Sequence, residues 1–159
     1  MKTRPLLYAL FTLVAALPLF ASSGETWTYD KLKSAADLVV IATPIVVQET
    51  NERTVLPGIE IAGPDNQPAP VAAVGVETDF EIQTTLKGST PLNRFILHHL
   101  REASPSATPS SNAPQLISFD PKKNIRYLMF LKKEKDGHYV SVTGQTDPAI
   151  AIFPLGTYP

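Results

Sequence analysis

Residues 74–86 read Val-Gly-Val-Glu-Thr-Asp-Phe-Glu-Ile-Gln-Thr-Thr-Leu, and this stretch decides the fold class. Apolar and polar side chains alternate along it. The apolar face consists of Val74, Val76, Phe80, Ile82 and Leu86 with two threonines, and the polar face of Glu77, Asp79, Glu81 and Gln83. Successive side chains of a β-strand point to opposite faces, so alternation is typical of a strand. The stretch predicts a strand with one face in a core and the other in water.

Three further stretches predict strands that are more deeply buried. Residues 38–47 are rich in β-branched side chains, and we expect a bulge or bend at Pro44 because proline cannot donate to a sheet. Residues 95–100 predict another strand. Residues 125–131 (Ile-Arg-Tyr-Leu-Met-Phe-Leu) predict the strongest core strand of the chain.

The remaining predicted elements are short. Lys-Asp-Gly at 135–137 is a hairpin signal, with a return strand over 138–142, and residues 149–153 predict a last strand. Thr28 or Asp30 is placed to cap a short N-terminal helix. Five or six strands, one short helix and no spacing for parallel strand–helix–strand units predict an all-β fold, a small OB-like barrel.

Two segments rich in proline predict long loops, over residues 51–73 and 103–114. The second has low complexity and predicts a mobile, dispensable tether. The first carries apolar side chains, and exposed apolar residues in a loop either fold back or contact a partner. We therefore predict a partner-binding surface that includes Leu56, Ile59 and Ile61.

The N-terminus has the pattern of a cleavable secretory signal peptide over residues 1–23. Lys2 and Arg4 form a basic start, residues 6–20 are apolar, and the small residues 21–23 suit cleavage. A membrane anchor is the alternative, but the apolar run is shorter than the roughly 20 residues that a span requires. The remaining chain, residues 24–159, predicts one domain in the periplasm or outside the cell, without a further membrane span.

Composition excludes several classes of protein. The chain has no cysteine, which excludes a disulfide scaffold, a thiol nucleophile and a cysteine zinc site. It has 14 basic and 15 acidic residues, and Lys2 and Arg4 leave with the leader. Twelve basic residues then face 15 acidic ones, a formal charge of −3, which is unfavourable for binding nucleic acid or an anionic membrane.

A set of ordered motifs resembles a known family outline. The motifs are Ala-Asp-Leu-Val-Val-Ile-Ala (36–42), a strand that closes in Leu-Lys-Gly (86–88), Tyr-Leu-Met-Phe-Leu (127–131) and an Asp-Gly hairpin (136–137). The chain resembles exported bacterial proteins with an OB-like barrel, similar in outline to the TIMP and netrin-module barrels. The resemblance implies a fold. It does not carry over metalloprotease inhibition, because the N-terminal cysteine that those inhibitors use is absent.

Candidate catalytic or metal-binding residues are sparse. His98 and His99 are neighbours in a predicted strand and point to opposite faces, so they cannot hold one ion together. Glu77, Asp79 and Glu81 share a face, which we interpret as a solvated strand surface. The sequence contains no Gly-x-Ser-x-Gly elbow and no phosphate-binding glycine loop. We predict no catalytic residue, no metal ligand and no cofactor.

These observations favour a non-enzymatic binding module of the cell envelope. Its partner would be a protein, a peptide or another envelope component. Two alternatives stay open: a hydrolase or metal-dependent enzyme without a recognisable motif, and a structural accessory of an envelope assembly. The lack of a nucleophile–base pair in the sequence favours the binding module.

Overall fold

The computed structural model describes residues 26–62, 67–104 and 116–157. The predicted leader lies outside these residues, as does nearly all of the predicted tether 103–114, so both remain predictions. Within the described part of the chain, no helix is long and apolar enough to cross a membrane.

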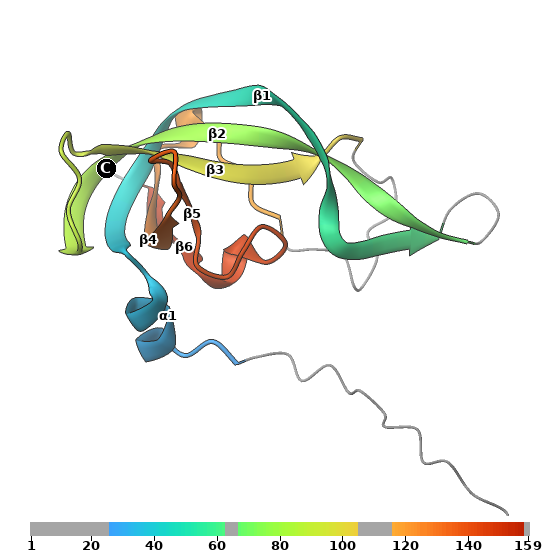
Figure 1. The fold of residues 1–159 in the computed structure, drawn as a ribbon. Coiled ribbons are helices and arrows are strands. Elements are labelled where there is room, and N and C mark those ends of the chain that lie inside the picture. The colour runs from blue at the N-terminus through green and yellow to red at the C-terminus, as the bar shows by residue number, and fades with distance from the viewer. Residues whose placement is uncertain (1–25, 63–66, 105–115, 158–159) are drawn as a thin grey trace, which may run out of the picture.

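The described chain consists of one α-helix, six strands and two short 3₁₀ turns (Figure 1). In chain order these are α1 (Tyr29–Ala35), β1 (Leu38–Ala62), β2 (Pro68–Lys87), β3 (Arg94–Glu102), η1 (Pro121–Lys123), β4 (Ile125–Lys133), β5 (Tyr139–Ser141), η2 (Pro148–Ile150) and β6 (Ile152–Thr157). The predicted all-β fold with one short N-terminal helix is confirmed.

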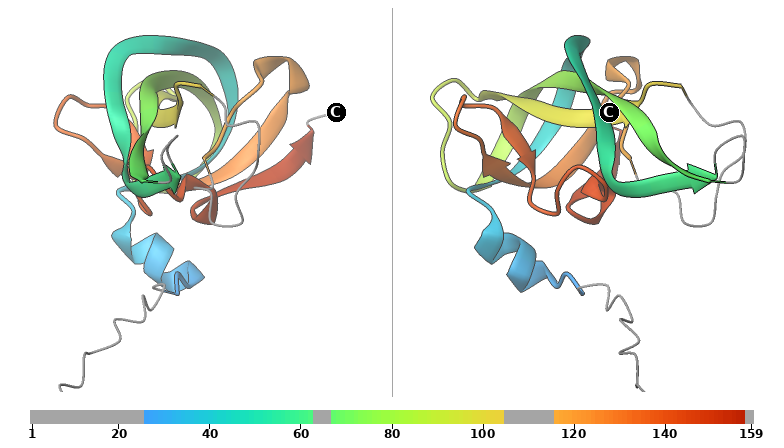
Figure 2. Two further views of the ribbon diagram at one scale, coloured as in Figure 1. Left: turned by 90° about the vertical axis from the view of Figure 1, so that its right-hand side faces the viewer. Right: turned by 45° about the vertical axis from the view of Figure 1, so that its right-hand side comes forward.

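Five of the strands close into a ring in the order β1-β2-β3-β5-β4. The ring closes because the start of β1, Leu38–Ala42, pairs with Tyr127–Leu131 of β4. The β3–β5 pair is parallel and the other neighbouring pairs are antiparallel. β6 adds to the first half of β4. Figure 2 shows the strands curling around a common axis, which confirms the predicted small barrel.

The barrel core is built around aromatic rings. Phe80 of β2 is fully buried and stacks on Phe95 of β3 with ring centroids 5.2 Å apart. Phe119 meets Phe80 edge-on at 4.9 Å. On β4, Tyr127 and Met129 point into the same core, as the strand period requires.

A second, smaller core lies outside the barrel wall, beneath α1. Thr28 caps this helix by accepting a hydrogen bond from the Lys31 amide at 3.3 Å, as predicted. Leu32 then packs against Val39 and Phe130, which face outward from the barrel strands. Burial of both faces of β4 explains why its sequence is apolar nearly throughout.

The prediction of a loop over residues 51–73 is wrong for most of its length. β1 continues to Ala62 and β2 begins at Pro68, and the two strands form a long hairpin arm (Figure 1). Four of the proline and glycine residues that suggested a loop lie, within the described chain, where pairing is interrupted or one-sided. Pro57 and Gly58 fall in the register shift between Val55 and Glu60, and Pro68 and Pro70 precede the point where β3 joins β2.

Two strand predictions need smaller corrections. Leu86 is 50% exposed: β2 runs on beyond its last pair with β3, Glu81↔Arg94, and its end pairs with β1 alone. The last strand is β6, which starts only after the turn η2, because Pro148 opens a 3₁₀ turn instead of a strand. The predicted irregularity at Pro44 is confirmed by a register shift between Pro44 and Val46.

Candidate functional site

The ring of strands is weakest where β3 meets β5. Leu97↔Tyr139 is the one pair recorded between them in the described chain, whereas β2 and β3 pair continuously from Ala73↔Glu102 to Glu81↔Arg94. β5 has only three residues and follows a tight turn, so it cannot accompany β3 further. We call the gap between residues 92–96 and 133–139 the β3–β5 seam.

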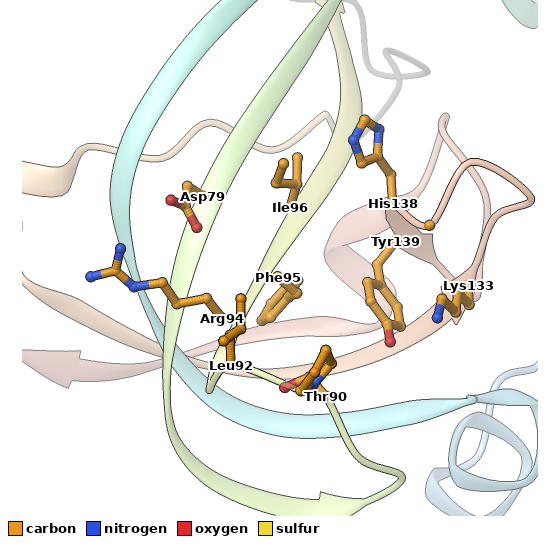
Figure 3. A pocket seen from close by; sticks show the side chains of 11 residues that line it. Asp79, Thr90, Leu92, Arg94, Phe95, Ile96, Lys133, His138 and Tyr139 are labelled. Carbon is orange, nitrogen blue, oxygen red and sulfur yellow. The ribbon is translucent and has the colours of Figure 1, made fainter.

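The seam holds a surface hollow of about 350 Å³. Figure 3 shows its two walls: Leu92, Phe95 and Ile96 lie on one side, and His138, Tyr139 and Lys133 lie on the other. Leu92 is 79% exposed, the highest value among the large apolar residues that the structure describes. The seam therefore presents one apolar side chain, Leu92, to solvent above buried aromatic rings.

The floor of the hollow is the edge of the barrel core. The rings of Phe95 and Tyr139 meet edge-on with centroids 5.7 Å apart. Burial raises the pKa of the Tyr139 phenol, with a smaller contribution from the carboxylate of Asp37, so the ring stays neutral at physiological pH. The ammonium of Lys133 lies 6.0 Å from the centre of this ring. A cation thus stands directly beside the apolar floor.

A second hollow borders the β4–β5 hairpin, and Lys133 lines both. It has a volume of about 610 Å³ and is lined mainly by charged residues: His98, Lys132, Lys133, Glu134, Lys135 and Asp136, with Val140. Side chains of the hairpin, Lys133 among them, therefore line both hollows.

His98 joins three parts of the structure on this face. Its Nε2 lies 2.7 Å from Oε2 of Glu52 on the β1–β2 arm, and its Nδ1 lies 3.4 Å from Oε2 of Glu134 in the hairpin. Glu52 reaches across β2 at Gly75, where any Cβ would collide with its carboxylate. The absent side chain at position 75 makes the bridge between arm and hairpin possible.

The second histidine of this face, His138, also lies between carboxylates. Its Nδ1 is 3.3 Å from Oδ2 of Asp136 and 3.8 Å from Oε1 of Glu77. Both acidic residues of the hairpin, Glu134 and Asp136, are therefore engaged by histidines. The exposed hairpin lysines have no ion pair with a carboxylate in the described structure; they are Lys132, Lys133 and Lys135.

The other histidine of β3 has a structural role. His99 is buried, its Nε2 lies 2.9 Å from Oγ1 of Thr78, and its ring meets Phe119 edge-on. Burial, together with the nearby charge of His98, lowers its pKa to about 4. The predicted opposite orientation of His98 and His99 is confirmed. Among the described residues, no three histidine, aspartate or glutamate side chains are arranged to hold a metal ion.

The three residues predicted to bind a partner have different environments. Leu56 is buried in a small core with Val71 and Leu100, so our premise that it is exposed was wrong. Ile59 is partly buried against the same core, and Ile61 is 47% exposed. The arm folds back on the barrel at Leu56, which leaves Ile61 available at the surface.

Sequence reasoning did not identify the β3–β5 seam. Leu92 is a single apolar residue in a turn, and the hairpin lysines alternate with acidic residues, so neither forms a recognisable motif. The one available signal was a large apolar side chain between the turn residues Pro91 and Asn93. Its meaning depends on how far β3 and β5 pair, which is a property of the closed barrel.

Comparison with known proteins assigns no relative. No protein-family model matches the chain, and a search of curated proteins finds no match. The function therefore has to be argued from the site itself.

Proposed function

We propose that this chain is an exported, non-enzymatic interaction module that binds a segment of a partner protein in the β3–β5 seam. The observation that carries the proposal is the seam itself, where Leu92 projects beside a hollow floored by Phe95 and Tyr139. An apolar concavity with a few charged groups at its rim is typical of a binding site.

The size of the hollow suits part of a peptide. Its volume of about 350 Å³ is near the lower end of the roughly 300–1,000 Å³ range of ligand pockets. It would accept one large side chain, with the flanking chain lying along the walls. Burial of an apolar side chain against Leu92 and the aromatic floor would contribute roughly 1.5–3 kcal/mol to binding.

The position of the seam agrees with how OB-type barrels are used. Ligands of such barrels tend to meet one face and the loops beside it, including the loop between strands four and five. Here the β4–β5 hairpin forms one wall of the hollow. This agreement is a fold-level analogy and supports the location of the site, whereas the chemistry comes from the residues.

The environments of His98 and His99 favour binding over hydrolysis. Both ring nitrogens of His98 face carboxylates, and His99 is buried against Thr78. A general base needs one nitrogen free to take a proton from a nucleophile or from water. The predicted signal peptide supports a location in the envelope or outside the cell.

Capture of a partner from the native envelope fraction would test the proposal. Leu92→Ser should abolish capture, because it removes the exposed apolar side chain at the hollow. Leu86→Ser is the matched control, since Leu86 is 50% exposed and does not line the hollow. Equal capture by the wild type and by Leu92→Ser would contradict the proposal.

The β1–β2 arm offers a second candidate surface, because two of its apolar residues are exposed. Val55 is 46% exposed and Ile61 is 47% exposed. This keeps the partner-binding hypothesis for the arm but moves it away from Leu56. Replacing Val55 and Ile61 together by serine should weaken capture if the arm contacts the partner.

A further inference from the structure

We infer that the segment bound in the β3–β5 seam is an acidic peptide with one large apolar side chain. The inference rests on the proposed function and adds the chemical class of its ligand. Two independent features of the seam carry it: the apolar floor selects the large side chain, and the lysines of the adjoining hairpin select the negative charge.

The charge of the hairpin follows from which of its groups are already paired. Residues 132–136 read Lys-Lys-Glu-Lys-Asp, which is nearly balanced in sequence. Glu134 faces His98 and Asp136 faces His138, so both carboxylates have partners within the protein. The three ammonium groups have no such partners in the described structure and are available to a ligand, and residues 132–136 carry a formal charge of +1, three lysines against two carboxylates.

This positive charge is local. The chain without its predicted leader has a formal charge of −3, and the hollow itself is lined by one carboxylate, Asp79, and two cations, Arg94 and Lys133. Lys133 lines both hollows, and Lys132 and Lys135 line the charged one. A carboxylate beside the apolar side chain of the ligand would therefore lie close to the hairpin lysines.

The seam fits a peptide better than it fits a membrane surface or a polyanion. A membrane surface or a polyanion would satisfy the lysines but leave the hollow empty. The edge of β3 also favours a peptide. In the described structure, the residues of β3 that precede Leu97 have no pairing with β5. An extended peptide can form main-chain hydrogen bonds with such an edge while it places one side chain in the hollow.

Selection from a library of random linear peptides, with the exported protein as bait, tests the inference. We expect the enriched peptides to carry aspartate or glutamate beside one large apolar residue. Enrichment of apolar peptides without acidic residues, or with basic ones, would overturn the inference and leave the proposed function standing. The proposed function would be overturned as well if no peptide were enriched, or if every enriched peptide bound the Leu92→Ser variant as it binds the wild type.

A charge variant provides the second measurement. Lys132→Gln, Lys133→Gln and Lys135→Gln combined should weaken binding of an enriched acidic peptide by about tenfold and reduce its salt dependence. The control is Lys122→Gln with Lys123→Gln, because these exposed residues belong to η1 and line neither hollow. Equal weakening by both sets of changes would overturn the inference.

Vesicles of anionic phospholipid provide the remaining comparison. We expect them to bind the protein weakly, and to bind the Leu92→Ser variant equally weakly. Tight vesicle binding that depends on the hairpin lysines would assign this surface to a membrane and overturn the peptide inference.

Discussion

Leu97 of β3 pairs with Tyr139 of β5, and this parallel pair joins the two strands within the ring. On one side of it, Nε2 of Gln145 donates a hydrogen bond to the His98 carbonyl at 3.3 Å, which holds the following loop against β3. On the other side the strands diverge around the hollow beside Leu92. The closure is thus short, and the proposed binding surface lies where it stops.

The core beneath α1 is predicted to contribute strongly to stability. Phe130 is fully buried there and meets Tyr29 edge-on at 5.2 Å. Phe130→Ala should lower the free energy of unfolding by about 3–5 kcal/mol in urea titrations, as expected for a truncated core phenylalanine. Phe153→Ala is the control, because Phe153 is 38% exposed, and its loss should be clearly smaller. Equal losses would mean that Phe130 is not a core residue.

Buried His99 is predicted to make stability depend on pH. Its pKa is about 4 in the folded protein and near 6.5 in the unfolded chain, so below pH 6.5 the unfolded state binds more protons. The contribution of neutral His99 to the free energy of unfolding is fully present above pH 6.5. It decreases by about 3 kcal/mol as the pH falls towards 4. His99→Gln should remove this component, so the wild type and the variant should differ in slope only within the window. Parallel curves would contradict the assignment.

Gly75 is predicted to be essential for the contact between arm and hairpin. A Cβ at this position would lie 2.6 Å from Oγ1 of Thr50 and would collide with the Glu52 carboxylate. Gly75→Ala should therefore destabilise the fold by about 1–3 kcal/mol and displace Glu52 from His98. Thermal melting would measure the loss. Ala72→Ser, at an exposed position of the same strand, should change stability by less than about 0.5 kcal/mol. A neutral Gly75→Ala variant would mean that Glu52 does not cross β2 here.

Export is predicted to leave an N-terminus near Gly24 or Ser22. Mass spectrometry of the protein recovered from the periplasm or the culture medium would measure this directly. Recovery of folded protein that still begins at Met1, extracted from membranes, would contradict the prediction of a cleaved leader.

Much of the barrel could be predicted from sequence because its signals are local. Alternation along β2, the apolar sequence of β4 and the Asp-Gly turn at 136–137 each identify an element without knowledge of the rest. The arm was missed because Pro57 and Gly58 are turn-forming residues, and only the register of β1 against β2 shows that a bulge accommodates them.

The candidate site could not be predicted because it depends on long-range geometry. The bridge of Glu52, His98 and Glu134 joins residues 46 and 36 positions apart. The burial of Leu56 depends on Leu100 of β3, and the exposure of Leu92 depends on where β3 and β5 stop pairing. None of these relationships leaves a periodic pattern in the sequence.

Chemical-shift mapping by NMR tests the central claim most directly. An enriched acidic peptide would be added to isotopically labelled protein spanning residues 24–159, and the backbone amide shifts would be followed. We predict that the largest changes fall at residues 92–96 and 133–139, the two walls of the β3–β5 seam, and that Leu92→Ser removes them. Largest changes at residues 55–61 of the arm, with the seam unaffected, would contradict the account.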